Sequence, residues 1–327
     1  MNHIRAIIPV AGIGTRLRPH TYTLPKVLLN VAGKPIIGHI MNRIIQEGIT
    51  KATFIVGYLG EMVADFIQKN YKIDAQFVYQ DEQKGLGHAI HLAKDTFNDD
   101  ELLIILGDTI FDVDLKSMLA SENSVLGVKE VENPSRFGVV IEKNGIITKL
   151  IEKPEKFISN KAIVGLYYIK NPKLLAKCLN EIIDKGITTK GEFQLTDALQ
   201  LMIEKGEKFT TFTVDGWYDC GKPETLLSTN HHLLEKLNHF ESRPDVLVIP
   251  PVYISPKSKV TNSIIGPYTT INDGAEVKNS IIKNSIIGVN AIVENVILHD
   301  SIVGNSATIK GKFKKINAGD STEIDFY

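Results

Sequence analysis

Residues 4–16 read IRAIIPVAGIGTR and join an apolar run directly to a loop with two glycines. The run Ile4–Val10 has the length and the β-branched content of a buried strand. Gly12 and Gly14 follow it, and glycines there let backbone N–H groups come close to an oxyanion. A strand that ends in such a loop is typical of α/β proteins, which bind ligands at the carboxyl ends of parallel strands.

The alternation of strand and helix patterns continues to about residue 106. Short apolar runs predict strands, and longer runs with a period near 3.6 predict helices. The predicted strands are Ile4–Val10, Ala52–Val56, Gln76–Tyr79 and Leu102–Leu106, and the predicted helices are Ile36–Gly48, Glu61–Lys69 and Gly87–Phe97. Repeated strand-loop-helix units predict a mostly parallel sheet with helices on both faces.

From Ser124 the pattern is mixed. Asn144 and Gly145 separate two strand-like runs and supply the positive φ that a tight hairpin turn needs. The predicted strands are Val125–Val131, Gly138–Glu142, Ile146–Glu152, Ala162–Ile169 and Phe209–Val214, and the predicted helices are Pro172–Lys185, Glu192–Glu204 and Glu224–Leu237. The first two thirds of the chain therefore predict an α/β fold with a Rossmann-like mixed sheet.

The last third follows a different pattern. The near-copies Asn262–Gly266, Asn284–Gly288 and Asp300–Gly304 belong to a region in which aliphatic residues recur every six positions. This step is too long for one strand and wrong for a helix, and it resembles the hexapeptide repeat of a short left-handed parallel β-helix. We expect about three coils, with an ordinary β-sandwich as the alternative.

Paired prolines mark the boundary between these regions. The predicted organisation is a catalytic-type domain over residues 1–237, a linker over 238–251, a β-helix over 252–315 and a tail over 316–327.

Composition excludes several classes of protein. Lys and Arg number 37 against 38 Asp and Glu in 327 residues, so no bulk basicity indicates a nucleic-acid or membrane partner. Only two cysteines occur, Cys178 and Cys220, which are too few for a disulfide framework or a metal site of their own. With no transmembrane-length apolar run, we expect a cytoplasmic protein.

Charge is unevenly distributed near the N-terminus. The first 46 residues contain six Lys or Arg, among them Arg16 and Lys26, and no Asp or Glu, which makes the glycine loop a candidate anion site. Leu17 stands where a dinucleotide-binding loop would have its third glycine, and no Gly-Lys-Ser/Thr of a P-loop occurs here. Dehydrogenases and kinase-type ATPases are therefore disfavoured.

Residues 12–19 (GIGTRLRP), 24–28 (LPKVL) and 33–35 (GKP) resemble the signature of the sugar-1-phosphate nucleotidyltransferases. The resemblance extends to about residue 235. It continues through residues 80–89 (QDEQKGLGHA), 106–108 (LGD), 137–140 (FGVV), 152–154 (EKP), 164–167 (VGLY), 191–197 (GEFQLTD) and 217–221 (WYDCG). It implies the reaction of a nucleoside triphosphate with a sugar 1-phosphate to give a nucleotide sugar and pyrophosphate, with Mg²⁺ as cofactor and no covalent enzyme intermediate.

Two aspartates are candidate metal ligands. Asp108 closes a run of aliphatic residues and Asp219 follows an aromatic pair, so both are expected at strand ends. Mg²⁺ is held by one or two carboxylates together with phosphate oxygens. The resemblance implies that both aspartates are ligands, whereas the plainer alternative for each is a turn or capping residue.

The resemblance also assigns substrate contacts. It implies that Arg16, Lys26 and Lys153 are catalytic cations, the last acting on the sugar phosphate. The implied nucleotide-binding residues are Ala11, Gly12, Gly14, Thr15, Arg16, Gln80 and Gly85, and the implied sugar-phosphate-binding residues are Gly138, Glu152, Lys153 and Glu192. A solvated lysine at 153 and a helix-start glutamate at 192 are the alternatives.

The resemblance leaves the nucleotide open. Gln80 and Gly85 match positions at which pyrimidine-specific members bind the base, which favours UTP or dTTP. The glycine loop and residues 84–89 resemble bacterial UTP–glucose-1-phosphate enzymes, whereas Leu106–Asp108 and Gly138–Val140 resemble thymidylyltransferases. A mannose-1-phosphate guanylyltransferase is the alternative of the same class.

Two further alternatives concern the whole chain. The same two-part architecture occurs in non-catalytic regulatory subunits, but these typically lack the residues that correspond to Arg16, Lys26 or Asp108. An acetyl-transferring β-helix would have only His299 to use. We therefore expect the β-helix to serve as a packing surface in a homo-oligomer.

Four histidines lack the spacing of a metal cage and are expected to be packing or surface residues. They are His20, His39, His88 and His91.

Overall fold

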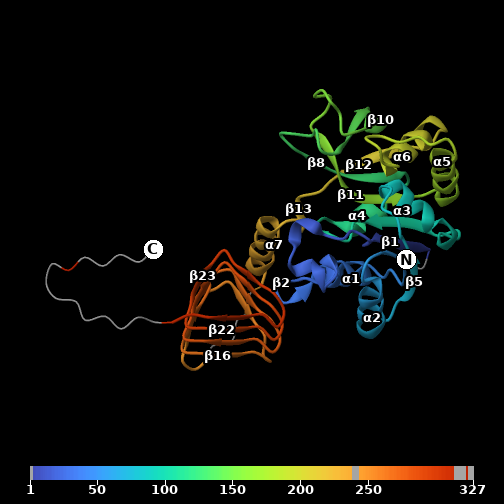
Figure 1. Ribbon diagram of the computed structural model, residues 1–327. Helices are drawn as coiled ribbons and strands as arrows, with labels where there is room; N and C mark the ends of the chain where they lie inside the picture. Colours follow the sequence, from blue (N-terminus) through green and yellow to red (C-terminus); the bar gives the residue numbers. More distant parts are fainter. Residues whose placement is uncertain (1–2, 238–242, 313–321, 323–327) are drawn as a thin grey trace. The chain divides into compact units, whose positions relative to one another are not determined.

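The computed structural model describes residues 3–237, 243–312 and 322, and the chain divides into two compact units, Met1–Thr229 and Asn230–Tyr327 (Figure 1). The boundary falls inside helix α7 (Pro223–Glu235), before the predicted boundary at residue 237. The predicted tail, 316–327, lies outside the described residues apart from residue 322. No helix in the described part of the chain is both long and apolar enough to cross a membrane.

The first unit is built on one nine-stranded sheet whose centre is parallel. The central strands are β1 (Ile4–Pro9), β4 (Lys51–Val56), β5 (Asp74–Tyr79) and β6 (Glu101–Ile105). β1 lies between β4 and β6 and is parallel to both, and β5 continues the sheet beside β4. All four were expected from their apolar runs, and the glycine loop leaves β1 at its carboxyl end.

Antiparallel strands extend the sheet beyond β6. They are β8 (Ser124–Glu130), β9 (Gly138–Lys143), β10 (Ile146–Glu152) and β11 (Lys161–Ile169), with β12 (Phe209–Thr213) parallel to β8. β11 pairs antiparallel with β6 and joins the two halves. Asn144 and Gly145, with φ of 53° and 78°, close the β9–β10 hairpin as predicted. The mixed sheet is confirmed.

Helices cover both faces of this sheet. One face carries α1 (Ile36–Gln46), α2 (Gly60–Asn70) and α4 (Leu115–Leu119), and the other carries α3 (Leu86–Leu92), α5 (Pro172–Asp184) and α6 (Leu195–Glu204). Successive side chains of β1 point to opposite faces of the sheet, so the strand contributes to two cores. Ala6 and Ile8 pack on the side of α1, α2 and α4, and Ile7 packs on the side of α3, α5 and α6.

Most helix boundaries lie within about two residues of the prediction, but two differ by more. α6 begins at Leu195 rather than at Glu192, because Thr189 and Glu192 bridge each other in a turn ahead of the helix. α3 ends at Leu92, and a separate short 3₁₀ helix, η4 (Lys94–Thr96), occupies most of the rest of the predicted span. The other short 3₁₀ helices are η1 (Thr15–Leu17), η2 (His20–Tyr22) and η3 (Lys26–Leu28).

Two short pairs of strands had no counterpart in the sequence prediction. β7 (Thr109–Asp112) pairs antiparallel with β13 (Gly216–Asp219), and β2 (Asn30–Val31) pairs with β3 (Lys34–Pro35). At two to four residues they are too short for a period to show. The β7–β13 ribbon matters most, because it begins directly after Asp108 and ends at Asp219.

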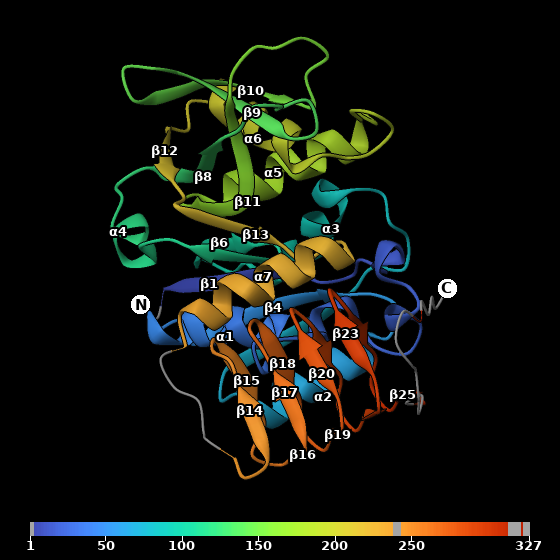
Figure 2. The same cartoon turned by 90° about the vertical axis from the view of Figure 1, so that its left-hand side faces the viewer.

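The second unit is a parallel β-helix with three sheets of four strands each (Figures 1 and 2). The first sheet contains β14 (Val246–Val248), β17 (Ser263–Ile265), β20 (Ile281–Lys283) and β23 (Ile297–His299). The second contains β15 (Val252–Ile254), β18 (Thr269–Ile271), β21 (Ile286–Ile287) and β24 (Ile302–Val303). The third contains β16 (Lys259–Thr261), β19 (Glu276–Lys278), β22 (Ile292–Glu294) and β25 (Thr308–Lys310).

The repeats fold as the six-residue step predicts, into the architecture of a left-handed β-helix. Ile265, Ile271 and Val277 are buried in the core, one from each sheet. Asparagines at the corners explain another part of the repeat: Asn262, Asn279 and Asn295 adopt positive φ and hydrogen-bond in a ladder at 2.7 and 3.0 Å.

The length of the β-helix was underestimated. The four strands in each sheet make about four coils rather than three, and the first strand, β14, lies inside the segment 238–251 that was expected to be a linker. Pro250 and Pro251 interrupt the apolar pattern of the first coil, which hides its similarity to the later coils.

Candidate active site

The glycine loop folds tightly at the carboxyl end of β1. Gly14 has a φ of +70°, and a Cβ there would lie 3.1 Å from the Cβ of Lys26, so a larger residue would be strained in conformation and tightly packed. Gly12 has no such neighbour within 4 Å. The loop forms one wall of a cavity of about 400 Å³ that Gly12, Thr15, Arg16 and Lys26 help to line.

Lys26 and Asp108 form an ion pair in this cavity. The Lys26 Nζ lies 2.5 Å from Oδ2 of Asp108, and the lysine side chain is 7% exposed while the aspartate is 40% exposed. The other carboxylate oxygen of Asp108 accepts a hydrogen bond from the Thr109 hydroxyl at 3.2 Å. Asp108 thus lies where the sequence predicts it, just beyond the end of β6.

Asp219 is brought beside Asp108 by the β7–β13 ribbon. Asp219 pairs with Thr109 in the ribbon, and the Cys220 backbone N–H donates to the Asp108 carbonyl at 2.9 Å. Arg16 lies close as well: a Cβ on Gly221 would lie 2.8 Å from Oδ1 of Asp219 and 2.9 Å from an Arg16 Nη atom. Residues more than 200 positions apart therefore meet at one point.

This arrangement fits the expected cation. Among the described residues no group of three or more His, Cys, Asp or Glu forms a complete metal site. Two neighbouring carboxylates beside an open cavity would instead suit a Mg²⁺ ion that takes its remaining ligands from phosphates and water.

A second cavity, of about 510 Å³, adjoins the first. Arg16, Asp108, Leu86 and Leu106 line both cavities. The larger cavity is also lined by Gly138, Glu152 and Asp219, and by Arg136, Phe137, Tyr167, Thr196, Trp217 and Lys222. Arg136 and Lys222 were missed by the sequence analysis, although each lies next to a quoted motif, so proximity to those motifs was the available signal.

Glu152 and Gly138 face each other in this cavity. Glu152 accepts a hydrogen bond from the Thr196 hydroxyl at 2.7 Å. A Cβ on Gly138 would lie 2.9 Å from Oε2 of Glu152, so the absence of a side chain there makes room for the carboxylate.

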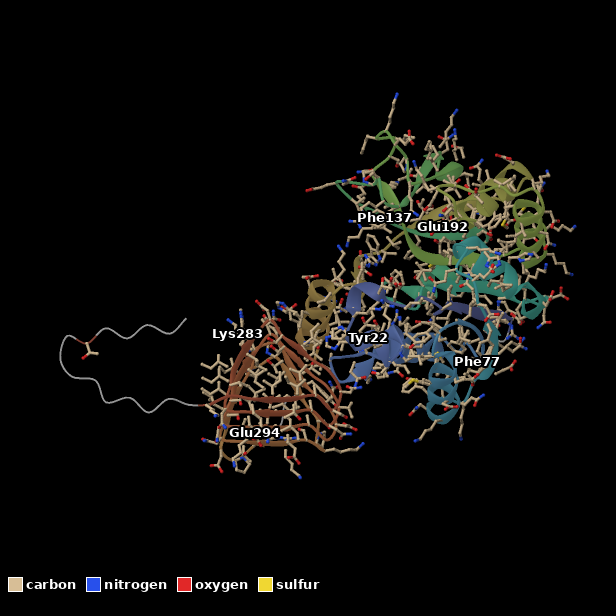
Figure 3. The ribbon with its side chains drawn as sticks, in the orientation of Figure 1. Tyr22, Phe77, Phe137, Glu192, Lys283 and Glu294 are labelled. Carbon is tan, nitrogen blue, oxygen red and sulfur yellow. The ribbon has the colours of Figure 1, made fainter. Side chains whose placement is uncertain are left out.

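Lys153 lies between two glutamates. Its Nζ is 3.6 Å from Glu152 Oε1 and 3.8 Å from Glu192 Oε2, and its backbone N–H donates to the Phe137 carbonyl at 3.0 Å. Figure 3 labels Phe137 and Glu192 in this part of the first unit. Glu192 is not a helix-start residue, because it precedes α6 and accepts a hydrogen bond from Gln194 at 2.9 Å.

The residues expected to bind the base lie in a separate loop. Gln80 is buried and its Nε2 lies 3.3 Å from Nδ1 of His88, whose pKa is lowered by burial and by Lys84, so the ring is neutral. Gly85 has a φ of +107°, and a Cβ there would lie 2.5 Å from the Phe193 carbonyl oxygen. Neither residue lines the two cavities above.

Gln83 links the loop that carries Gln80 to the glycine loop. Its side-chain amide donates to the Ala11 carbonyl at 2.9 Å, and it lines the smaller cavity. The sequence analysis missed this residue, because nothing in the local pattern indicates a contact 72 positions away.

Both cysteines are buried and unpaired, as expected of core residues. Burial raises the pKa of Cys220 to about 12 and that of Cys178 to about 11, so both thiols are uncharged. Cys220 contributes a backbone N–H to the site, donated to the Asp108 carbonyl.

Comparisons with known proteins identify the family of the chain. Residues 5–236 match the family model described as nucleotidyl transferase. The chain is 41% identical over 237 residues to the bifunctional protein GlmU of Methanocaldococcus jannaschii, a match that covers 71% of this chain and 55% of that protein. It is 32% identical to the UTP–glucose-1-phosphate uridylyltransferase AglF of Haloferax volcanii, covering 71% of this chain and 98% of the relative.

A solved structure shows the same fold. A Bacillus anthracis protein described as a glucose-1-phosphate thymidylyltransferase superposes with a TM-score of 0.60 at 27% identity, covering 73% of this chain and 98% of that one. The chain spans about half the length of the GlmU proteins it matches.

Proposed function

Because this chain belongs to the nucleotidyl transferase family, we propose that it transfers a nucleotidyl group from a pyrimidine nucleoside triphosphate to a sugar 1-phosphate and releases pyrophosphate. The observation that carries the proposal is the meeting of Arg16, Lys26, Asp108 and Asp219 around two adjoining cavities. One cavity has the glycine loop as its wall and suits a triphosphate. The other contains the predicted sugar-binding residues Gly138 and Glu152.

The two reactants are both anions, so the protein must neutralise charge and align the reacting atoms. Arg16 and Lys26, with the backbone of Ala11, Gly12, Gly14 and Thr15, bind the triphosphate and then the leaving pyrophosphate. Asp108 and Asp219 would hold Mg²⁺, which when bound supplies positive charge beside the α-phosphate.

The second substrate is held from the opposite side. Lys153 binds the sugar phosphate, and its two neighbouring glutamates keep the ammonium in place at 3.6 and 3.8 Å. Glu152 and Glu192 accept hydrogen bonds from sugar hydroxyls, and the backbone of Gly138 approaches the sugar. A phosphate oxygen of the sugar then attacks the α-phosphorus in line, and no covalent enzyme intermediate forms.

The preference for a pyrimidine rests on Gln80 and Gly85. The Gln80 amide can pair with the O4/N3 edge of uracil or thymine, while the backbone of Gly85 approaches the base. A purine presents a different edge and could not make the same pairing with the Gln80 amide. The names of the Haloferax volcanii and Bacillus anthracis proteins point to UTP and to thymidylyl transfer, both with glucose 1-phosphate.

A matrix of nucleoside triphosphates against sugar 1-phosphates, read as pyrophosphate release, tests the proposal. We expect up to ~10⁴-fold preference for pyrimidines over purines, because a hydrogen-bonding site strongly rejects unpaired partners. UTP and dTTP should differ little, since a 5-methyl group changes binding by only about 1–3 kcal/mol. If GTP with mannose 1-phosphate reacts best, the guanylyltransferase alternative is correct, and if no pair reacts, the regulatory alternative replaces catalysis.

We also propose that the chain forms a homo-oligomer through the β-helix. The outer face of the first sheet carries an aliphatic ladder of Leu247, Ile264, Ile281 and Ile297, and Ile297 is 74% exposed. The third sheet instead carries paired charges, such as Lys310 with Glu294. Figure 3 labels Glu294. Asn230 and His231 of α7 contact Thr270 and Tyr268 beside the second sheet.

Sedimentation tests the oligomer. Ile297→Lys should shift the protein toward monomers, whereas Lys259→Ala on the charged sheet should not. A wild-type protein that sediments only as a monomer contradicts the proposal.

His299 is exposed and lies 3.2 Å from Asp300, and we expect no acetyl transfer from acetyl-CoA that depends on it.

A cytoplasmic location is part of the same proposal. Its support is the pair of buried, unpaired thiols, which suit a reducing compartment. Fractionation of cells that express the natural protein would test it.

A further inference from the structure

The ammonium of Lys26 contacts the carboxylate of Asp108, which the proposed function makes a ligand of Mg²⁺. The 2.5 Å distance to Asp108 Oδ2 is that of a direct charge-assisted hydrogen bond, and the lysine side chain is almost completely buried. Gly14 lies close to the aliphatic part of this lysine, since a Cβ on the glycine would lie 3.1 Å from Lys26 Cβ. The pair is therefore unlike a solvated surface contact, which water and salt would weaken.

Both oxygens of Asp108 are engaged in this state. Oδ2 accepts from Lys26 and Oδ1 accepts from the Thr109 hydroxyl. A cation bound to Asp108 would meet the lysine ammonium at the same carboxylate, and two positive charges repel strongly where burial limits screening. In this state the lysine and a divalent cation compete for one ligand.

Lys26 also faces the place where phosphates are expected. It lines the smaller cavity together with Gly12, Thr15 and Asp108. The lysine ammonium stands on a flexible four-carbon stem and needs only rotation of its last bonds to change partner. A triphosphate in this cavity would offer Lys26 an alternative anion.

We infer that in the nucleotide-free protein Lys26 occupies the cation position on Asp108 and excludes a divalent cation, and that Lys26 gives up this carboxylate only when a triphosphate arrives. Lys26 then serves two anions in turn, first the aspartate and later the phosphates. Cation and nucleotide consequently enter together rather than cation first. The inference rests on the proposed function for the identity of the second anion.

Titration of the nucleotide-free, full-length protein with Mn²⁺, followed by the electron paramagnetic resonance signal of the free ion, tests this exclusion. Lys26→Gln should bind Mn²⁺ at least ~10-fold more tightly than wild type, because one competing charge is removed from the ligand. Lys26→Arg keeps the charge and should bind as weakly as wild type. Lys222→Gln is the matched control, since it removes one positive charge from the adjoining cavity, and it should change the affinity less than ~3-fold.

Adding Asp108→Asn to Lys26→Gln should abolish the gain in affinity. The inference is overturned if Lys26→Gln binds Mn²⁺ no more tightly than wild type, if Lys222→Gln shows an equal gain, or if the gain survives loss of the Asp108 charge. Lys26→Met serves in its place if circular dichroism shows that Lys26→Gln is unfolded. Failure of the proposed function is a separate result, in which wild type makes no nucleotide sugar from any substrate pair whatever its affinity for Mn²⁺.

Discussion

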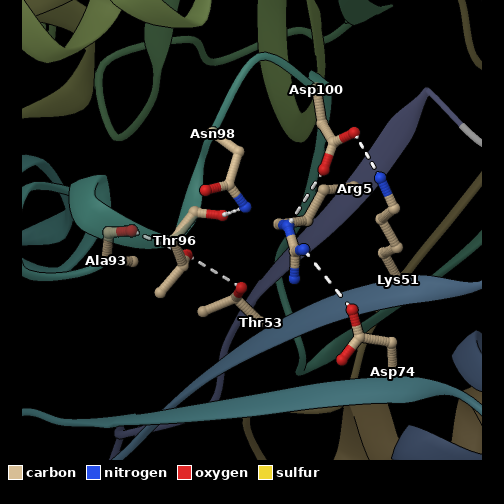
Figure 4. A network of polar contacts seen from close by, with 8 residues as sticks. All are labelled: Arg5, Lys51, Thr53, Asp74, Ala93, Thr96, Asn98 and Asp100. Carbon is tan, nitrogen blue, oxygen red and sulfur yellow. Dashed lines mark hydrogen bonds and ion pairs between the residues drawn. The ribbon is translucent and has the colours of Figure 1, made fainter.

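The two ends of the same parallel strands carry charged clusters of the same residue types with opposite surroundings. At the amino ends, Arg5 is buried and lies 3.4 Å from Asp100 and 3.6 Å from Asp74, while Lys51 lies 2.6 Å from Asp100 (Figure 4). At the carboxyl ends, Arg16, Lys26, Asp108 and Asp219 line cavities that open to ligands.

The two clusters differ in whether their charged side chains can reach a ligand in a cavity. None of the described cavities is lined by the amino-end cluster, whose charges are used on each other. At the carboxyl end the charged side chains also line open cavities, although Lys26 and Asp108 pair there. Charge pairs alone therefore do not indicate function, whereas charges that converge on a cavity do. Mutations should separate the two ends into one that controls stability and one that controls activity.

Arg5→Met should produce the largest effect on stability. Removing the guanidinium leaves Asp100 buried with Lys51 as its remaining cation, and breaking a buried pair costs about 3–5 kcal/mol. The measurement is the free energy of unfolding in a denaturant titration. Lys51→Met is the control and should cost less, because this lysine is more exposed. A loss of turnover without a loss of stability would break the comparison.

Asp108→Asn and Asp219→Asn should show the reverse pattern. Each is expected to lower turnover by at least ~10²-fold while the protein remains folded, because each removes a charge from the Mg²⁺ shell. Steady-state rates under saturating Mg²⁺, with thermal melts beside them, provide the measurement. Near-normal rates in both variants would show that these carboxylates do not hold the metal.

Lys153→Ala should act on one substrate only. We expect KM for the sugar phosphate to rise about 10-fold and KM for the nucleotide to stay unchanged, since the ammonium is proposed to contact only the sugar phosphate. Lys190→Ala, which removes an exposed lysine paired with Glu155 at 2.8 Å, is the control and should change neither constant. Equal effects on both substrates would move Lys153 to the triphosphate.

Glu101→Gln should have the smallest effect on the free energy of unfolding, and this effect should depend on pH in the acid range. Burial raises the pKa of Glu101, but hydrogen bonds from Lys170 and Tyr168 outweigh it and lower the pKa below the usual 4.5. A lowered carboxyl pKa stabilises the fold above the unfolded value, and this stabilisation is lost as pH falls through the folded value. Unfolding free energies measured between about pH 6 and 3 should therefore fall less steeply in the variant than in wild type. Equal slopes would show that the contacts of Glu101 with Lys170 and Tyr168 do not stabilise the fold.

The strong periodic signals in the sequence were sufficient for most of the fold. Strands β1, β4 and β6 are short, mostly apolar runs, and the aliphatic step of six identified the β-helix. The β7–β13 ribbon was not predictable, because four-residue strands show no period and their pairing joins segments about 100 residues apart. The first coil could not be recognised in the sequence, because Pro250 and Pro251 interrupt the six-residue repeat there. Strands β14 and β15 of the β-helix form in spite of these prolines.

The site was predictable as a set of residues but not as a set of contacts. Asp108 and Asp219 could be placed at strand ends from local sequence, and the structure brings them together. The contact of Lys26 with Asp108, that of Gln80 with His88 and that of Gln83 with Ala11 depend on how distant loops pack. Local sequence carries no record of such packing, so these contacts required three-dimensional coordinates.

The raised pKa values of the two buried thiols have a practical consequence for labelling. At neutral pH neither Cys178 nor Cys220 presents a thiolate, which is the form that reacts with maleimides. Since the chain contains two cysteines in all, a single cysteine introduced at Ile297 would be the dominant point of attachment for a fluorophore. The rate at which it reacts, followed as protein concentration rises, would report directly whether the aliphatic ladder becomes covered.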